Sequence, residues 1–343
     1  MQRFVVGSGR CGSTLLSRML DESPDTLNLF EFFNGLDLAE RFDPHPIPGS
    51  ALAELIAREQ PFVTAVLRRG YPVEEITYPF ADGDASALFR GKRKRADPLP
   101  WVLVSTLPRL DSKPDSLFDR MMEFVGSLPE QPPREHYLAL FAWLCSRFDR
   151  RFWIERSGSS IDYVADLIHL FPAARFVHIH RSGPEVALSM REHHAYRLPI
   201  TLLYDAPLGE GKRVSELAPL DLDGIPNPRD TISQILESRP PAEFFGRYWS
   251  DQILHGKPAL AELPREQLLE ISFEDLVEDP RHVLGAVADF LEIHPGRGEE
   301  NWLVRAAALS RGRPPQRLPL LARDERERLL KACESGSRLI GRA

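Results

Sequence analysis

Two glycines near the start of the chain enclose residues that are suited to binding an anion. Residues 4–20 read FVVGSGRCGSTLLSRML, with a short apolar run before the turn and an amphipathic helix pattern after it. A strand, a glycine-rich turn and a helix N-terminus aim backbone N–H groups and the positive end of the helix dipole at one point. We therefore expect an anion, most often a phosphate, to bind between Gly7 and the start of this helix.

The basic residue of this loop stands in an unusual place. Loops that bind ATP or GTP read G-x-x-x-x-G-K-[ST], with the lysine directly after the second glycine. Here Gly7 and Gly12 keep that separation, but Ser13 occupies the lysine position and the cation has moved to Arg10. The predicted anion-binding residues are Gly9, Arg10, Cys11, Gly12, Ser13 and Thr14.

A second arginine is a candidate for binding a second phosphate. Arg181 ends a predicted strand, and Ser189 lies in the helix that follows, on the side that returns toward the strand end. A guanidinium and a hydroxyl placed in this way can hold a phosphate. The alternative is structural, with an arginine bonded to helix carbonyls and a serine on a solvated face. Taken with the Arg10 loop, the phosphate-binding interpretation is favoured.

The elements that must position these residues alternate between strand and helix patterns. Strands are expected at 4–6, 26–33, 151–155, 175–180 and 268–273, and helices after the loop and near 134–150, 159–171 and 280–291. This alternation implies a parallel sheet with right-handed crossovers. We predict a three-layer α/β, P-loop-like fold with a central parallel sheet, formed by residues 1–343 as one domain. Residues 274–279 are expected to form a turn, and residues 36–133 and 192–240 to be largely helical or irregular insertions.

Composition excludes several classes of protein. The chain has 343 residues, of which 43% are hydrophobic and 27% charged, and no run approaches the roughly 18 apolar residues of a membrane span. Because the anion loop begins at Phe4, we expect no signal peptide before the fold. Cys11, Cys145 and Cys333 are too scattered for a disulfide scaffold or a zinc site, which favours a cytoplasmic location.

Charge argues against a nucleic-acid partner, and residue spacing argues against a metal ion. A net charge of -7 does not favour general nucleic-acid binding, and the basic run at 91–95 is interpreted as a solvated loop. The histidines lack carboxylate or thiol partners at a consistent spacing, so no metal is predicted. They are His178, His180, His193 and His194.

Together these segments resemble the sulfotransferase family that uses 3′-phosphoadenosine 5′-phosphosulfate (PAPS), and its bacterial carbohydrate and protein-tyrosine branches most. In that family the 5′-phosphosulfate loop carries its cation ahead of the second glycine, as Arg10 does here. The 3′-phosphate element is an arginine with a serine eight residues later, as Arg181 and Ser189 are. Residues 170–181 and 272–280 resemble the strand before that element and the C-terminal strand and helix.

The resemblance also implies roles for further residues. In the two branches named above, a glutamate just beyond the loop helix deprotonates the acceptor, and Glu31 has a similar setting at the end of a strand. Arg156 matches by order and spacing a lysine that contacts the sulfonate region. For both residues a structural ion pair is the alternative. Trp249, Arg311 and Arg313 loosely resemble positions that cover the nucleotide.

Sulfuryl transfer by in-line displacement is the reaction that this resemblance implies. The acceptor is a hydroxyl or an amine of a small molecule, carbohydrate, lipid or peptide. Glu31 is expected to take its proton, and Arg10 to stabilise charge on the leaving oxygen. Sulfuryl groups carry less charge than phosphoryl groups, so cationic side chains can replace the Mg²⁺ of a kinase and no metal is required.

Two other functions remain open from the sequence. A P-loop kinase or NTPase would need lysine at position 13 and an acidic metal ligand at a strand end, whereas the strand ends here carry Arg156 and Arg181. The second alternative is a non-catalytic nucleotide-binding relative of the enzyme. The acceptor's identity and the oligomeric state, a homodimer included, are left undetermined.

Overall fold

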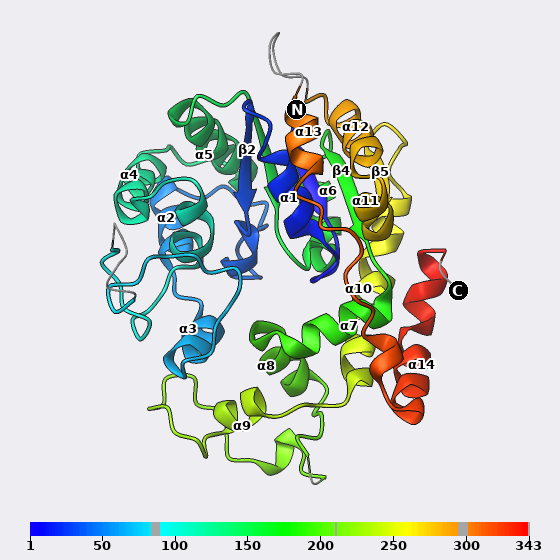
Figure 1. The fold of residues 1–343 in the computed structure, drawn as a ribbon. Helices are drawn as coiled ribbons and strands as arrows, with labels where there is room; N and C mark the ends of the chain where they lie inside the picture. Colours follow the sequence, from blue (N-terminus) through cyan, green and yellow to red (C-terminus); the bar gives the residue numbers. More distant parts are fainter. Residues whose placement is uncertain (84–89, 210, 294–300, 342–343) are drawn as a thin grey trace. The chain divides into compact units, whose positions relative to one another are not determined.

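Five parallel strands form one sheet in the computed structural model of the protein (Figure 1). The structure describes residues 1–83, 90–209, 211–293 and 301–341. The strands are β1 (Arg3–Val6), β2 (Thr26–Phe30), β3 (Phe152–Arg156), β4 (Arg175–His180) and β5 (Leu268–Ser272), in the order β2-β3-β1-β4-β5. Each lies where a strand is predicted, so the α/β fold with a central parallel sheet is confirmed.

The chain divides into two compact units. The first unit contains Met1–Ile56, Asp119–Arg181 and Gln252–Pro315, and it holds the whole sheet and the glycine-rich loop. The second unit contains Ala57–Phe118, Ser182–Asp251 and Gln316–Ala343. Two helices, α4 (Pro114–Gly126) and α10 (Ala242–Ala261), each continue from one unit into the other.

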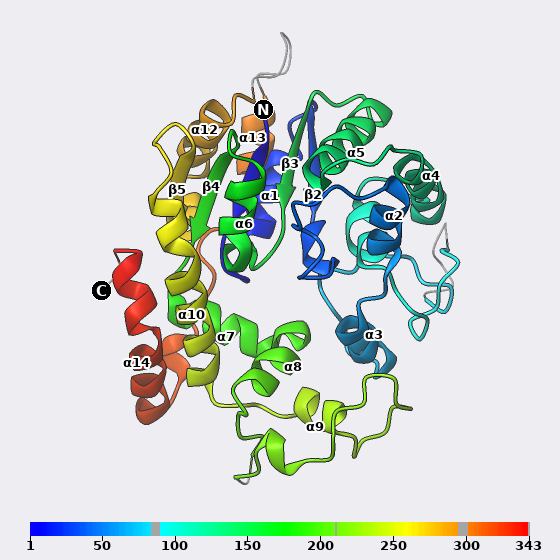
Figure 2. The same cartoon turned by 180° about the vertical axis from the view of Figure 1, so that it is seen from behind.

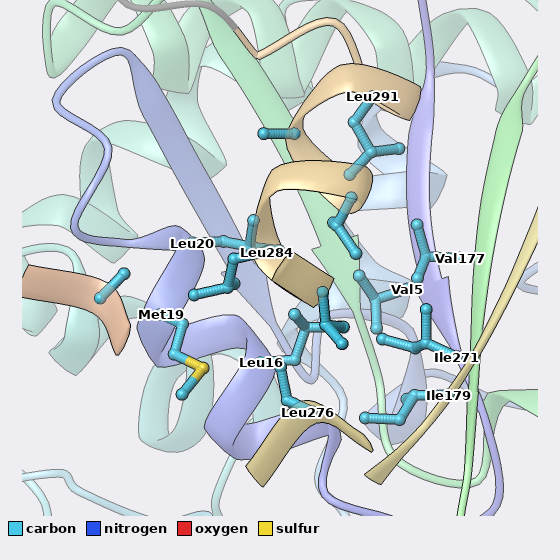
Figure 3. Packing of buried hydrophobic residues seen from close by; sticks show 14 of the residues in the cluster. Val5, Leu16, Met19, Leu20, Val177, Ile179, Ile271, Leu276, Leu284 and Leu291 are labelled. Atoms are coloured by element: carbon cyan, nitrogen blue, oxygen red, sulfur yellow. The ribbon is translucent and has the colours of Figure 1, made fainter. Parts of the chain in front are cut away.

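One face of the sheet is covered by four helices that follow the loop and the last strand (Figure 3). These helices are α1 (Ser13–Leu20), α11 (Phe273–Glu278), α12 (Pro280–Phe290) and α13 (Trp302–Ala307). Leu16, Leu276 and Leu284 pack from three of them against Val5 of β1 and Val177 of β4, and all five side chains are buried. This packing fixes the start of α1 against the carboxyl end of β1.

Figure 2 shows the sheet from the side opposite to α1. The side chains on this face are aromatic. The ring of Phe4 contacts Trp153 of β3 and Phe176 of β4, and Phe141 of α5 (Pro133–Arg147) packs on Trp153. The next residue on β1, Val5, faces the other way because successive side chains of a strand alternate between faces. Both faces of the sheet are therefore covered, which is why these strands read as continuous apolar runs in the sequence.

Three predicted boundaries in the first unit differ from the structure. β2 ends at Phe30, and Glu31 follows with a φ of 57° that leaves the extended conformation. The helix expected at 159–171 is divided into a 3₁₀ turn, Ser160–Tyr163, and α6 (Val164–Leu170). The predicted turn at 274–279 is helical, as α11, because the Ser272 side chain caps it by accepting a hydrogen bond from the backbone N–H of Asp275.

The second unit is mostly helical. Its helices are α3 (Pro61–Arg68), α7 (Gly183–Glu192), α8 (His194–Leu203), α9 (Thr231–Glu237) and α14 (Arg323–Leu339), with a π-helical segment at Val102–Thr106. Val66, Trp101, Leu198 and Ile235 share its buried core. The remaining helix of the first unit is α2 (Gly49–Ala57). None of the helices in the described ranges is long and apolar enough to cross a membrane.

The basic run at 91–95 lies in a loop of the second unit. Its backbone is held by two buried groups, since the Tyr78 hydroxyl accepts a hydrogen bond from Arg93 N–H and the Asp115 carboxylate accepts one from Lys92 N–H. Burial raises the pKa of Tyr78 to about 12, with the hydrogen bond from Arg93 N–H opposing the effect and the hydrogen bond to Asp115 adding to it. The side chains of Lys94 and Arg95 are exposed, as expected for a solvated loop.

Candidate active site

The glycine-rich loop connects β1 to α1 and requires glycine at two of its positions. Gly12 is the N-cap of α1 with a φ of 100°, and a Cβ there would overlap the ring of Phe273. A Cβ on Gly7 would overlap the Ile179 carbonyl oxygen and the Cys11 sulfur. The loop therefore packs tightly against its neighbours, and these contacts determine the path of its backbone. As predicted, the N-terminal end of a helix follows it.

Arg10 and Arg181 lie beside each other at this loop. Arg181 Nη1 donates a hydrogen bond of 3.4 Å to the Arg10 carbonyl oxygen, and the Arg181 guanidinium lies 4.6 Å from the centroid of the Phe273 ring. Arg10 itself has a φ of 61°, a conformation that is uncommon for residues other than glycine. The two arginines that the sequence singles out are thus brought together, and Phe273 contacts both Gly12 and Arg181.

Phe273 was not predicted from the sequence. It directly follows β5, and the carboxyl ends of all strands in a parallel sheet meet at one edge, where open α/β sheets bind ligands. Its position at the end of the strand predicted at 268–273 is therefore the signal that could have identified it.

Ser189 and Trp249 belong to the second unit, where both are buried. Ser189 lies in α7 and exposes 6% of its surface. Trp249 is completely buried, with Gly183 and Gly336 packed so closely against its ring that a Cβ on either would overlap neighbouring atoms. In the first unit, the exposed Arg313 forms an ion pair with Glu278, and Arg311 is exposed.

Glu31 is held by donors from several directions. Its carboxylate accepts hydrogen bonds from Arg156 Nη1 and Asn34 Nδ2, and from Gly158 N–H at 3.0 Å to each oxygen. Its own backbone N–H donates to the Arg156 carbonyl oxygen at 2.8 Å. The residue is only 2% exposed, and its positive φ places it among the strained conformations that cluster at functional sites.

Arg156 connects Glu31 to the glycine-rich loop. While Nη1 is bound to Glu31, Nη2 donates a 2.8 Å hydrogen bond to the Thr14 hydroxyl, and the guanidinium lies 3.9 Å from the centroid of the Phe30 ring. The structure therefore brings the predicted base, the predicted cation and a predicted loop residue into one chain of contacts. This ion pair is also what the structural alternative expects, so the contact alone does not assign a catalytic role.

Asn34 is a second residue that the sequence did not single out. Besides Glu31, its amide donates to the Gly158 carbonyl oxygen at 2.6 Å, and its Oδ1 accepts from the Tyr163 hydroxyl at 3.1 Å. The guanidinium of Arg41 lies 4.0 Å from the centroid of the Tyr163 ring. These contacts fix the amide so that it donates both to the Glu31 carboxylate and to the Gly158 carbonyl oxygen.

Glu155 brings a second carboxyl group close to Glu31. It precedes Arg156 on β3 and is completely buried. Burial raises the pKa of Glu155 to about 8, with the negative charge of Glu31 adding to the effect and a hydrogen bond from Ser157 opposing it. At neutral pH this group is therefore mostly protonated.

The four histidines are placed in three different settings. The buried His178 contacts Glu270 at 2.8 Å, and Lys257 contacts the same carboxylate at 2.5 Å. These two hydrogen bonds, His178 first, lower the pKa of Glu270 to about 2. His193 lies 3.2 Å from Glu75, and burial lowers the pKa of His194. The ring of His180 lies beside that of His178, with centroids 5.7 Å apart.

Across residues 1–83, 90–209, 211–293 and 301–341, no group of three or more His, Cys, Asp and Glu side chains could hold a metal ion. All three cysteines are free and buried. Burial raises the pKa of each thiol, to about 11 for Cys145 and about 12 for Cys333. The thiols are therefore in their neutral form at physiological pH.

Comparison with known proteins gives one family. No curated protein matches the chain. Similar solved structures include the sulfotransferase domain from the curacin biosynthetic pathway, with 14% identity, 97% coverage of both chains and a TM-score of 0.46. The sulfotransferase domain from a Synechococcus olefin synthase has 19% identity, coverage of 97% of this chain and 93% of that chain, and a TM-score of 0.40.

A sulfotransferase from Mycobacterium avium has 17% identity, coverage of 98% of this chain and 76% of that chain, and a TM-score of 0.45. The model of the sulfotransferase family matches residues 3–201, which is more than half of the chain and includes the glycine-rich loop. The chain therefore belongs to the sulfotransferase family.

Proposed function

We propose that this protein transfers a sulfuryl group from PAPS to an acceptor hydroxyl or amine by in-line displacement. The observation that supports it most is the chain of contacts from Glu31 through Arg156 to Thr14. It joins a candidate base to an anion-binding loop, and a base must lie within reach of the reacting group. The family supports transfer of a sulfuryl group, and the donor and the acceptor are the proposed parts.

Donor binding is assigned to two groups of residues. The loop amides, Arg10, Ser13 and Thr14 are proposed to bind the 5′-phosphosulfate, where the dipole of α1 adds favourable charge. Arg181 with Ser189 is proposed to recognise the 3′-phosphate. Arg181 reaches the loop through its contact with the Arg10 carbonyl oxygen, which supports a role at the nucleotide.

Arg156 has a proposed double role. In the ligand-free protein it neutralises Glu31, and the same guanidinium touches Thr14 of the loop. A sulfuryl group arriving beside Thr14 would compete for Arg156 and draw it away from the carboxylate. Glu31 would then lose a donor that stabilises its charge, and would become a stronger base at the moment when the donor is bound. Arg156 would in turn stabilise charge on the transferring group.

The kinase or NTPase function is less well supported. Ser13 stands where the phosphate-binding lysine would be needed. β3 ends in Arg156, and Arg181 directly follows β4, so both positions carry a basic residue where a metal-binding acid would be needed. No metal is required in the proposed reaction, because the arginines can supply the positive charge. The intact set of Arg10, Glu31, Arg181 and Ser189 argues against a non-catalytic relative.

The acceptor side is proposed to come from the stretches at 36–133 and 192–240, and the acceptor to be a small molecule, carbohydrate, lipid or peptide. We infer a cytoplasmic location from the free buried thiols, which suit a reducing compartment. A homodimer remains compatible with the proposal.

The function is tested by incubating the protein with PAPS that carries radioactive sulfur and a panel of acceptors from the four classes. We expect label to move to at least one acceptor with the parent protein and not with Arg10→Ala. Transfer of phosphorus label from ATP to the same panel, with none from PAPS, would contradict the proposal.

A further inference from the structure

Glu155 is a buried acid that the proposed transfer does not use. None of its surface is exposed, although a carboxyl group is costly to bury unless hydrogen bonds satisfy it. Its Oε1 accepts a hydrogen bond of 2.5 Å from the Ser157 hydroxyl. Its Oε2 has no hydrogen-bond partner among the described residues. A group that is so incompletely satisfied and so close to the candidate base calls for a physical reason.

Ser157 connects Glu155 to the turn that contacts Glu31. Its hydroxyl donates to Glu155 and accepts a hydrogen bond of 3.2 Å from the backbone N–H of Phe33. Phe33 begins a 3₁₀ turn, Phe33–Gly35, and the next residue in this turn is Asn34. The amide of Asn34 donates to the Glu31 carboxylate. A continuous relay therefore runs from Glu155 through Ser157 and the turn to the predicted base.

The titratable and charged side chains that act on Glu155 or on Tyr163 come from several elements. Glu31 follows β2, Arg156 lies on β3 beside Glu155, and Tyr163 lies on the 3₁₀ turn at Ser160–Tyr163. Arg41 is stacked on the Tyr163 ring. Burial raises the pKa of Tyr163, and the charge of Glu155 is the next cause in size. A negative charge on Glu155 would therefore act on the hydroxyl as well as on Glu31.

The proton on Glu155 limits the charge at this site. With a pKa of about 8, Glu155 is mostly neutral at pH 7, so it adds little negative charge beside Glu31 at that pH. Above that pH a second buried negative charge would form beside Glu31 and compete with it for Arg156. Two carboxylates that share one site disfavour each other's ionisation.

We propose that Glu155 is a positioning residue for the predicted base: acting through Ser157, it holds the turn that aims Asn34 at the Glu31 carboxylate. This inference rests on the proposed function, because it gives Glu31 a role in the transfer. Glu155 itself does not touch the reacting groups and acts through its neighbours.

Carboxyl-carbon NMR of protein labelled at the glutamate side chains tests this without any ligand. The resonance that disappears in Glu31→Gln is that of Glu31. In Ser157→Ala, which cuts the relay, we expect the Glu31 resonance to shift at pH 7. The matched control is Ser105→Ala, another buried serine, whose hydroxyl bonds to the Trp101 carbonyl oxygen in the second unit. It should leave the Glu31 resonance in place.

Glu155→Gln provides the second variant. The amide oxygen can still accept from Ser157, so the Glu31 resonance should keep its parental position at pH 7. In the parent this resonance should follow a titration step near pH 8, and in Glu155→Gln the step should be lost. A step that persists in the glutamine variant overturns the proposal, as does an unchanged Glu31 resonance in Ser157→Ala.

If Ser157→Ala fails to fold, Ser157→Cys takes its place in the same measurement, because a thiol of similar size is a much weaker hydrogen-bond donor to Glu155. Because no nucleotide is present, the result is independent of donor binding. A protein that shows the relay but does not bind adenosine 3′,5′-bisphosphate would contradict the proposed function and leave the relay standing.

Discussion

Arg156 and Glu31 form an ion pair in which the two side chains expose only 2% and 3% of their surface. Removing one partner of a buried pair typically costs about 3–5 kcal/mol, because the other charge is left uncompensated. The pair therefore has to be examined with substitutions that keep its hydrogen bonds.

Glu31→Gln should keep donor affinity and lose most of the transfer activity. Glutamine keeps an oxygen that can accept from Arg156 and Gly158 but has no basicity, so the proton-transfer contribution, about 10²–10⁴-fold, should be lost. The measurement is the turnover rate with any acceptor identified in the labelling screen, together with the midpoint of thermal unfolding as a check on folding. Turnover within a few-fold of the parent would place the base elsewhere, and His180, His193 and His194 would be mutated next.

Arg181→Ala should weaken binding of adenosine 3′,5′-bisphosphate while the fold is retained. Loss of hydrogen bonds to a charged phosphate costs on the order of 1.5–3 kcal/mol. Calorimetric titration measures this loss, and adenosine 5′-monophosphate serves as the control ligand because it lacks the 3′-phosphate. The same loss of affinity for both ligands would show that Arg181 does not recognise this group.

Gly12→Ala should destabilise the protein and weaken anion binding. Its φ of 100° disfavours any side chain, and the added Cβ would overlap the Phe273 ring. The matched control is Gly285→Ala in α12, where no atom lies within 4 Å of the new Cβ and alanine should stabilise the helix by about 0.5–1 kcal/mol. Urea unfolding of both variants measures the two effects. Similar stability changes in both variants would mean that the loop is not held as tightly as its contacts indicate.

The stability of the parent should decrease with pH in a range set by Glu155. Its pKa is raised from 4.5 to about 8 in the folded protein, chiefly by burial. Between these two values the folded state binds more protons than the unfolded state, so this stabilising contribution is complete below pH 4.5 and is lost as the pH rises through 8. Urea unfolding across this range should show Glu155→Gln gaining stability relative to the parent. A difference between the two proteins that stays constant with pH would mean that Glu155 ionises normally.

The strands and the loop were predictable because their causes are local. Buried parallel strands read as short apolar runs, and the loop is marked by Gly7, Gly12 and Arg10 within six residues of one another. The helices of the second unit were harder to predict because most are short, and α8 contains Pro199 within its span. α11 was predicted as a turn because its six residues are too few to show a helical period.

The contacts of the site depend on residues that are distant in the sequence. Glu31 and Arg156 could be predicted as site residues because Glu31 follows a strand and Arg156 ends one. That the two side chains bind each other could not be predicted from the sequence. The relay joins Glu155 and Ser157 to a turn more than a hundred residues earlier, and no spacing rule predicts it.

The most direct test of the proposed donor is a comparison of two ligands by calorimetry and thermal unfolding. Adenosine 3′,5′-bisphosphate has two separate phosphates, matching the loop at Arg10–Thr14 and the second site at Arg181. We predict that it binds and raises the melting temperature, since a ligand at a hundredfold excess over its Kd stabilises the folded state by about 2.7 kcal/mol. ATP with Mg²⁺ should do so far less. Equal or stronger stabilisation by ATP with Mg²⁺ would contradict the PAPS assignment and favour a kinase or NTPase.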